Sequence, residues 1–577
     1  MLVSWKEHYN RWMNHEDLDL ALKEQLLSIK DEVILKEYFH HYLQFGTAGI
    51  RGKLGPGINR LNIYMIRKVA EGLAQYILEH GEEAKVRGVV IAYDNRRKSQ
   101  EFAFEVAKTL GYHGIQSYVF ESLRTTPELS FAVRFLHTKA GVMITASHNP
   151  PEYNGLKVYG EDGGQVTSEV GDRIVAKVNE VEDELSVKVA QQEDLEKSGL
   201  LQIIGETVDR AYFSQLKSVT INETIAQKYG KDLKIVYTPF HGTGLVPVTT
   251  ALKEAGFSNV TVVEEQAKPD SNFTHAPTPN PEEHAAFELA IKYGKKVGAD
   301  LLIGTDPDAD RMGVAVPAED GSYKVLTGNQ IGAILLDYLL KEKSKQKKLP
   351  KNGAMLKSIV TSELGTAIAS DYGVTTENVL TGFKYIAEKI DEYHKSGEFE
   401  FLFGYEESYG YLIKDFVRDK DAVQACLLMA EVAAFYKAKG MTLQDALISL
   451  FEKYGYYLET IKSIRLEGIE GAKKINDILR NLKNDPFTEI GGEKVVIYED
   501  YEAGIRSDLI TKDEERIPLP KSKVLKWILE NGSWICARPS GTEPLIKFYF
   551  GVKGDTLLES ENKLATYVAE VMSRVNQ

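Results

Sequence analysis

Short apolar runs alternate with longer amphipathic stretches along this chain, and three segments share one order. Residues 88–120 read GVVIAYDNRRKSQEFAFEVAKTLGYHGIQSYVF, which is an apolar strand, a polar loop, an amphipathic helix, a glycine break and a second strand. Residues 233–265 repeat that order, and residues 354–384 do so less regularly. This spacing predicts βαβ units with right-handed crossovers and parallel strands. An internal triplication would explain them.

The pattern changes near residue 455 to shorter, more alternating strands, and a helix is expected over residues 557–574. A chain of 577 residues is also too long for one hydrophobic core. We therefore expect an α/β fold with three related mixed α/β domains and a smaller C-terminal α+β domain. The predicted boundaries are 1–205, 206–326, 327–455 and 456–577.

Composition and charge narrow the class of protein. With 43% hydrophobic and 27% charged residues, the chain resembles an ordinary soluble globular protein. A formal net charge of -14 argues against nucleic acid or an anionic membrane as the main partner. The two cysteines lie in apolar runs, the start of the chain is polar, and no run reaches the roughly 20 apolar residues of a membrane helix. We expect a cytoplasmic protein without a disulfide framework.

Polar loops that follow apolar runs are candidate sites, because ligands of open α/β sheets bind at the carboxyl ends of the strands. Five such loops stand out: FGTAGIRG (45–52), TASHNP (145–150), GTDPDADR (304–311), GYEESYG (404–410) and ARPSGTEP (537–544).

The loop GTDPDADR places Asp306, Asp308 and Asp310 directly after an apolar strand. These carboxylates repel one another unless a cation or a protonation shift neutralises them, and three hard oxygen donors suit Mg²⁺. An EF-hand would need glycine and glutamate where Arg311 and Pro317 stand. The remaining alternative is a solvated acidic turn.

The loop TASHNP presents Ser147 and His148. A phosphorylated Ser147 would add about -1.5 to -2 charge and three acceptor oxygens, which suits a cation held by three carboxylates. The alternative is a turn or cap hydroxyl. The pair is not a hydrolase dyad, because the chain shows neither a GxSxG elbow nor a third orienting residue. We expect His148 to orient the serine loop.

The other loops suit anions or sugar hydroxyls. Arg538 offers a planar fork to a phosphate beside Ser540, Gly541 and Thr542, and GYEESYG presents Glu406, Glu407 and Ser408 to neutral hydroxyls. Plain surface turns are the alternatives. FGTAGIRG is not a Walker A loop, although Arg51 could face an anion. HGTGLVP (241–247) nearly matches a dinucleotide fingerprint, but Pro247 replaces the third glycine and is expected to begin a helix.

The ordered set TASHNP, DPDADR, GYEES and RPSGTEP resembles the α-D-phosphohexomutase superfamily, in its phosphoglucomutase and phosphomannomutase branch. The resemblance covers nearly the whole chain, with one motif in each predicted domain. It implies four domains around a central cleft. Pro307, Ala309 and Tyr405 stand where many members carry glycine, so the motifs leave the choice of sugar open.

The resemblance also implies roles for individual residues. Ser147 would carry the transferable phosphoryl group and, with Asp306, Asp308 and Asp310, would hold Mg²⁺. The remaining catalytic candidates are His148, Lys157, Arg51 and Arg311, and the substrate-binding candidates are Lys384, Glu406, Ser408, Arg538, Ser540, Gly541 and Thr542. For Lys157 and Lys384 the alternative is a structural lysine in an ordinary ion pair.

The implied reaction is the reversible interconversion of glucose 1-phosphate and glucose 6-phosphate through glucose 1,6-bisphosphate. Phosphomannomutase and phosphopentomutase activities are alternatives within the same class. A metal-dependent sugar phosphatase and a non-catalytic sugar-phosphate-binding protein are alternatives from other classes.

Overall fold

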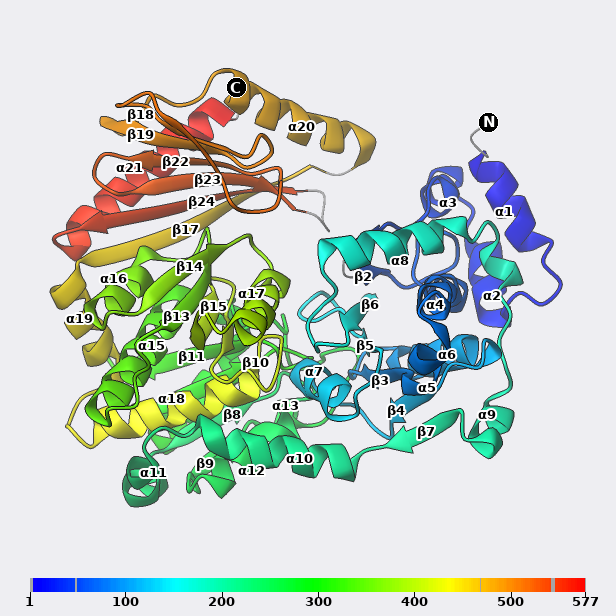
Figure 1. The fold of residues 1–577 in the computed structure, drawn as a ribbon, viewed down its shortest axis with the longest axis horizontal. Coiled ribbons are helices and arrows are strands. Elements are labelled where there is room, and N and C mark those ends of the chain that lie inside the picture. Colours follow the sequence, from blue (N-terminus) through cyan, green and yellow to red (C-terminus); the bar gives the residue numbers. More distant parts are fainter. Residues whose placement is uncertain (1–3, 47–48, 467, 541–544, 576–577) are drawn as a thin grey trace. The chain divides into compact units, whose positions relative to one another are not determined.

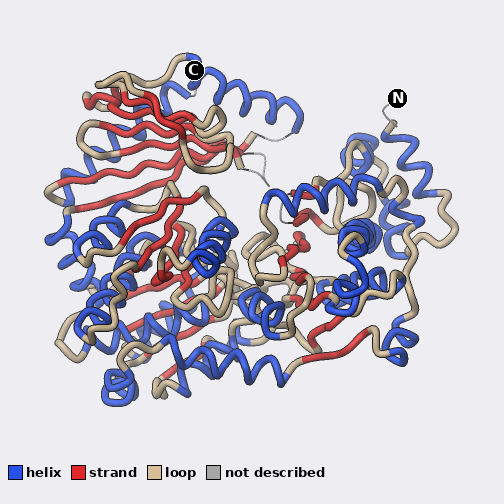
Figure 2. Tube along the Cα trace, viewed as in Figure 1, coloured by secondary structure: helices blue, strands red, loops and turns tan. Residues whose placement is uncertain are grey.

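The computed structural model describes residues 4–46, 49–466, 468–540 and 545–575, and the chain divides into two compact units. The first unit comprises Met1–Leu326, Phe383–Phe403 and Ser408–Gly440, and the second comprises Thr327–Gly382, Gly404–Glu407 and Met441–Gln577. Figure 2 shows helices around the strands of each unit. None of the described helices combines the length and the apolar character that a membrane crossing requires.

The first sheet has the order β1-β2-β6-β5-β3-β4-β7. Strands β5, β3, β4 and β7 pair in parallel, whereas β6 runs antiparallel to β5, and β2 to β6. The runs VVIAY in β3 and AGVMI in β5 are buried at every position, as expected for central parallel strands covered on both faces. The strands are β1 (Phe45–Gly46), β2 (Gly49–Lys53), β3 (Val89–Tyr93), β4 (Ser117–Phe120), β5 (Ala140–Ile144), β6 (Tyr153–Gly160) and β7 (Leu201–Ile204).

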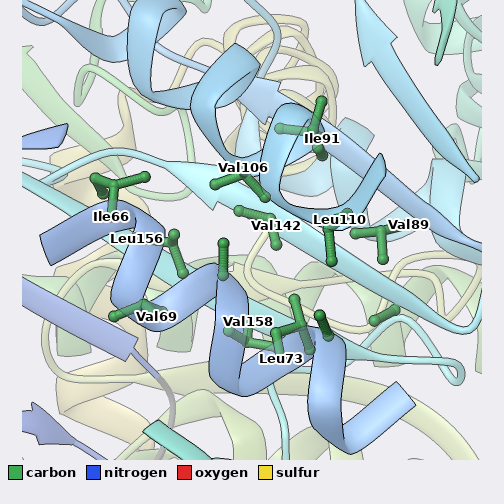
Figure 3. Close-up of a cluster of buried hydrophobic side chains, with 14 of the residues drawn as sticks. Ile66, Val69, Leu73, Val89, Ile91, Val106, Leu110, Val142, Leu156 and Val158 are labelled. Atoms are coloured by element: carbon green, nitrogen blue, oxygen red, sulfur yellow. The ribbon is translucent and has the colours of Figure 1, made fainter. Parts of the chain in front are cut away.

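The core of this sheet forms against the apolar face of α4, which places Ile66, Val69 and Leu73 on one side at helical spacing. Figure 3 shows them near side chains of α6 and of the strands, including Val106 and Val142. The helices around this sheet are α1 (Trp5–Met13), α2 (Leu20–Ser28), α3 (Glu32–Phe39), α4 (Ile63–Leu78), α5 (Gly81–Arg87), α6 (Ser99–Tyr112), α7 (Thr126–Phe135), α8 (Ser168–Glu180), α9 (Gln192–Ser198) and α10 (Glu206–Leu216).

The second sheet has the order β12-β11-β10-β8-β9, with β10, β8 and β9 parallel and β11 antiparallel to β10. Its strands are β8 (Ile235–Thr238), β9 (Val260–Val262), β10 (Leu301–Thr305), β11 (Met312–Pro317) and β12 (Tyr323–Val325). The helices that follow α10 are α11 (Glu223–Tyr229), α12 (Leu245–Glu254), α13 (Glu264–Ala267) and α14 (Glu288–Val297). Pro247 is the third residue of α12 rather than the first, still within the turn whose N–H groups need no helical partner.

The third sheet has the order β14-β13-β15-β16, in which β13 and β14 are parallel. Its strands are β13 (Gly353–Ser358), β14 (Thr375–Val379), β15 (Glu400–Glu406) and β16 (Gly410–Leu412). The helices of this part of the chain are α15 (Gly328–Lys345), α16 (Glu363–Asp371), α17 (Phe383–Ser396), α18 (Ala422–Lys437) and α19 (Leu443–Tyr454).

The three predicted βαβ segments are β3-α6-β4, β8-α12-β9 and β13-α16-β14, and the predicted parallel pairing is confirmed in each (Figure 1). The sheets also share the orders β6-β5-β3-β4, β11-β10-β8-β9 and β16-β15-β13-β14. The loops TASHNP, DPDADR and the end of GYEESYG therefore follow the corresponding strands β5, β10 and β15. The triplication places these three chemistry-bearing loops at equivalent positions of three related sheets.

The C-terminal sheet is antiparallel, with the order β17-β24-β23-β22-β19-β20-β21 and β18 paired to β19. Its core includes Trp527 and Phe548, both fully buried. The predicted closing helix is present as α21. The elements are β17 (Tyr456–Arg465), α20 (Gly468–Asn484), β18 (Glu489–Ile490), β19 (Glu493–Asp500), β20 (Ile505–Asp508), β21 (Glu514–Arg516), β22 (Leu525–Leu529), β23 (Trp534–Pro539), β24 (Leu545–Gly554) and α21 (Leu557–Val575).

Candidate active site around Ser147

Ser147 lies in the loop that joins β5 to β6, and its side chain is buried. Its backbone adopts φ 51°, a left-handed conformation that few non-glycine residues take. The Ser147 N–H donates to Oγ1 of Thr145 at 2.8 Å, which supports the turn. The Ser147 hydroxyl donates to Oδ2 of Asp306 at 2.6 Å. The structure thus brings the candidate nucleophile into direct contact with the candidate metal loop.

His148 follows the serine, and its Nδ1 lies 3.1 Å from Ser147 Oγ. Burial holds the pKa of His148 well below its ordinary value, and the nearby guanidinium groups of Arg311 and Arg51 lower this pKa further. The imidazole is therefore neutral near pH 7, and it can accept a hydrogen bond but carries no charge.

The metal loop follows β10 and turns sharply at Ala309, whose φ is 52°. The carboxylates of Asp306, Asp308 and Asp310 are buried and offer oxygen atoms within 4.8 Å of one another. Asp306 Oδ1 accepts the backbone N–H groups of Asp310 at 3.1 Å and Arg311 at 3.0 Å. The loop thus uses part of one carboxylate to hold its own shape.

The remaining oxygens fit a bound cation. Asp308 Oδ1 and Asp310 Oδ1 are buried and have no hydrogen-bond partner among the described residues. Burial and the charges of Asp308 and Asp310 raise the pKa of Asp306 well above its ordinary value. A divalent cation would offset the repulsion among the carboxylates and would coordinate the oxygens that accept no hydrogen bond, so these three aspartates could hold a metal ion.

Two lysines neutralise part of the acidic charge. Lys157 of β6 places Nζ 2.8 Å from Asp308 Oδ2 and 3.4 Å from Asp310 Oδ2, and Lys420 Nζ lies 3.0 Å from Asp310 Oδ2. Burial alone would raise the pKa values of Asp308 and Asp310, but the lysines outweigh it and both values lie below the ordinary one. Lys157 lowers the pKa of Asp308, and Lys420 and Lys157 lower the pKa of Asp310. Burial lowers the pKa of Lys157, but the two carboxylates raise it by more. The Lys157 ammonium is therefore charged.

The two predicted arginines also belong to this first unit. Arg51 of β2 donates to Asn149 Oδ1 at 2.6 Å, so it contacts the serine loop. Arg311 donates to Glu282, and its Nε lies 3.8 Å from Asp310 Oδ1. Both guanidinium groups lower the pKa of His148, which belongs to the serine loop.

The segment that resembled a dinucleotide fingerprint supports the metal loop. The N–H and the hydroxyl of Thr243 both donate to the carbonyl of Pro307, at 2.8 and 2.9 Å. A Cβ atom on Gly242 would lie 2.4 Å from the Pro307 Cα, so the two backbones can approach this closely only with glycine at position 242. Thr126 of α7 also contacts the loop, because its hydroxyl donates to Asp308 Oδ2 at 2.7 Å.

The substrate-binding candidates divide between the two units. In the first unit, Lys384 lies in the first turn of α17, and Ser408 lies just after β15. Burial lowers the pKa of Lys384. In the second unit, Glu406 Oε1 accepts the N–H of Gly382 at 2.7 Å, and the Ser540 N–H donates to the carbonyl of Leu545 at 2.8 Å. Arg538 lies in β23. Gly541 and Thr542 lie outside the described residues.

Sequence reasoning missed Lys420 and Asp419. Lys420 Nζ lies 3.1 Å from Asp419 Oδ1, and Asp419 Oδ2 accepts the hydroxyl of Tyr159 at 2.8 Å. The segment RDKD precedes the apolar helix α18, which Asp421 caps by accepting the N–H groups of Val423 and Gln424. Such a charged cluster just before a buried helix was the available signal.

Comparisons with known proteins agree with this arrangement. Family models described as phosphoglucomutase/phosphomannomutase alpha/beta/alpha domains I, II and III match residues 42–185, 210–321 and 327–454, and the model of the C-terminal domain matches residues 467–565. A phosphoglucomutase of Staphylococcus epidermidis is 40% identical over 546 residues, which cover 92% of this chain and 97% of that protein.

Solved structures share the fold. A putative phosphomannomutase from Thermus thermophilus has a TM-score of 0.66 at 22% identity, covering 93% of this chain and all of that one. The phosphoglucomutase pp63/parafusin from Paramecium, in its open form, has a TM-score of 0.66 at 18% identity, covering 92% of this chain and 93% of that one. With four matching domain models and relatives 40% identical along most of its length, this chain belongs to the phosphoglucomutase/phosphomannomutase family.

Proposed function

We propose that this chain catalyses the reversible interconversion of glucose 1-phosphate and glucose 6-phosphate, through a phosphorylated Ser147 and a glucose 1,6-bisphosphate intermediate. The observation that carries the proposal is the hydroxyl of Ser147, 2.6 Å from Asp306 Oδ2 in a buried cluster of three carboxylates. The name of the 40% identical relatives favours glucose as the sugar.

Asp306, Asp308, Asp310 and the phosphorylated Ser147 would hold Mg²⁺. When bound, the ion neutralises negative charge that develops on the transferring phosphoryl group. The Oδ1 atoms of Asp308 and Asp310, which accept no hydrogen bond from the described residues, support this assignment. Glucose 1,6-bisphosphate would serve both as intermediate and as the source of the phosphoryl group on a fresh Ser147.

In the forward half-reaction, the bond between Ser147 Oγ and phosphorus breaks while a free hydroxyl of the sugar forms the new P–O bond. The sugar hydroxyl loses its proton and Ser147 Oγ gains one, and the second half-reaction reverses both changes at the other phosphate. Lys157, which is charged and contacts Asp308 and Asp310, would supply a proton and, once neutral, would accept one. His148, which is neutral, would orient Ser147, and Arg51 and Arg311 would stabilise the negative charge.

The other candidates would bind the substrate. Glu406 and Ser408 would contact the sugar, and Lys384 would be a further substrate contact. The loop with Arg538, Ser540, Gly541 and Thr542 would hold the phosphate that does not react. We assign these loops to domains 1–205, 206–326, 327–455 and 456–577, which carry the serine, metal, sugar and phosphate loops in that order. We also propose a cytoplasmic location, because both cysteines are buried and unpaired, which suits a reducing compartment.

An assay with glucose 1-phosphate and a trace of glucose 1,6-bisphosphate tests the proposal. We expect glucose 6-phosphate as the product, and S147A should lose turnover while keeping its fold, because only an alcohol oxygen is removed. Mannose, ribose and deoxyribose 1-phosphates test the other mutase activities. Release of inorganic phosphate without a bisphosphate primer would instead identify a phosphatase, and near-normal turnover of S147A would exclude the covalent step.

A further inference from the structure

Arg96 lies in the loop between β3 and α6, outside every motif assigned above. Strand β3 pairs in parallel with β5, and Tyr93 at the end of β3 is in register with Ile144 at the end of β5. Loops that follow neighbouring parallel strands leave the sheet at the same edge. The topology therefore places Arg96 beside the loop that carries Ser147.

Among the described residues, the guanidinium of Arg96 donates only to backbone carbonyls of that loop and of the first residue of β6. Nη1 donates to Pro150 at 2.9 Å and to Tyr153 at 3.0 Å, and Nη2 donates to Ser147 at 2.5 Å and to Asn149. The Arg96 side chain is fully buried. One planar cation thus binds three carbonyls of the serine loop and one at the start of β6, including the carbonyl of Ser147 itself.

This turn needs such support. Ser147 has a left-handed φ of 51°, which an isolated serine rarely adopts. The buried carbonyl of Ser147 requires a donor, and a guanidinium offers five N–H groups in a rigid planar fork. Without Arg96, the carbonyls at positions 147, 149, 150 and 153 would lose these donors together.

Arg96 is itself held in place. Its backbone N–H donates to Asp94 Oδ1 at 2.9 Å, and the same oxygen accepts the hydroxyl of Ser99 at 2.7 Å. The guanidinium also lies 5.0 Å from the ring centre of Phe273. Its geometry is therefore set before any substrate binds.

We propose that Arg96 is a positioning residue that fixes the serine loop, and with it the Ser147 oxygen, in the geometry needed for phosphoryl transfer. The inference rests on the proposed function. The four hydrogen bonds described for the guanidinium go to main-chain oxygens, so its loss should lower kcat while leaving the substrate-binding residues, and hence KM, nearly unchanged.

The experiment compares Arg96→Met, Arg96→Lys and a control, Arg134→Met. Arg134 lies in α7 and donates to the carbonyl of Asp415 at 2.7 Å, so its removal also takes a carbonyl-bound guanidinium from the first unit. Steady-state kinetics with glucose 1-phosphate give kcat and KM. Hydrogen–deuterium exchange of the unliganded protein reports the amides of residues 145–153 and does not depend on turnover.

We expect kcat of R96M to fall about 100-fold with KM within about threefold of wild type, because a misplacement of about 1 Å costs that much. Loop amides should exchange faster in R96M. R96K should recover part of kcat, since an ammonium can donate to some of the four carbonyls but not as a planar fork. R134M should keep kcat within about threefold of wild type and leave exchange at 145–153 unchanged.

Three results would overturn the inference: unchanged kcat in R96M, an equal loss of kcat in R134M, or unchanged exchange in the serine loop. If R96M does not fold, R96K decides the matter by the same split between kcat and KM. An inactive wild-type protein would refute the proposed function, and the exchange arm would still test whether Arg96 holds the loop. Normal wild-type turnover with a normal R96M would refute only the role of Arg96.

Discussion

Replacing Lys157 with methionine separates the electrostatic and the chemical roles of that lysine. In the structure the ammonium contacts Asp308 Oδ2 at 2.8 Å and Asp310 Oδ2 at 3.4 Å. Methionine retains an unbranched apolar side chain of similar length but carries no charge. Because a metal ion would need the same carboxylates, the lysine competes with the metal for them.

The expected size of this competition follows from the distances. With an effective dielectric constant of about 20, each of the two contacts is worth about 5 to 6 kcal/mol before desolvation. Burial of the ammonium and of the carboxylates offsets most of this attraction. We take a net of about 1.5 to 3 kcal/mol, which predicts that K157M binds Mg²⁺ about 10- to 100-fold more tightly than wild type.

Turnover should change in the opposite direction. If Lys157 carries the proton between the sugar hydroxyl and Ser147, its loss should lower kcat by about 10² to 10⁴. A variant that binds the metal more tightly but turns over more slowly would distinguish this role from a defect in metal binding.

Isothermal titration of Mg²⁺ into the dephosphorylated protein, alongside steady-state kinetics, provides both measurements. Lys139→Met is a matched control, because the side chains of Lys139 and Lys157 are both 13% exposed and Lys139 pairs with Glu161 at 3.3 Å. The control should change neither quantity. Unchanged or weaker Mg²⁺ binding in K157M would refute the competition, and unchanged kcat would refute the proton transfer.

Two further perturbations test the surroundings of the site. Gly242→Ala should destabilise the protein by about 1 to 3 kcal/mol in chemical denaturation, because the new Cβ would lie 2.4 Å from the Pro307 Cα. The same variant should bind Mg²⁺ more weakly. Unchanged stability and unchanged Mg²⁺ affinity would contradict the close approach. Burial raises the pKa of Asp421 to about 6, so its ionisation disfavours folding above that pH and the cost disappears as the pH falls towards 4. Asp421→Asn should therefore be more stable than wild type by up to about 3 kcal/mol at pH 8 and nearly equal to it near pH 4, whereas a pH-independent difference would refute the shift.

Local patterns predicted much of this molecule. The βαβ order of residues 88–120 and its two repeats follows from hydrophobic runs of a few residues, and each run became a strand or helix of the expected type. The three aspartates of the metal loop are recognisable because they follow directly after an apolar strand. Ser147 stands out for the same reason, since the fold places such loops at the ends of strands.

Contacts between distant segments could not be predicted from the same patterns. Lys420 reaches Asp310 although 110 positions separate them in the chain, and no periodicity indicates that pairing. Arg96 reaches the Ser147 carbonyl 51 positions away, and its place depends on the order of β3 and β5 in the sheet. HGTGLVP departs from a dinucleotide fingerprint at Pro247, and its packing against Pro307 depends on the neighbouring strand β10, which the pattern does not indicate.

The most direct test of the central claim follows the phosphoryl group on Ser147. The protein is incubated with glucose 1,6-bisphosphate and Mg²⁺, the modified residue is located by tandem mass spectrometry, and the phosphoprotein is then mixed rapidly with glucose 1-phosphate. We expect phosphate on Ser147 and its transfer to the sugar at a rate at least equal to kcat. A fully active protein whose Ser147 is never modified, or whose phosphate leaves more slowly than turnover, would exclude a phosphoserine intermediate.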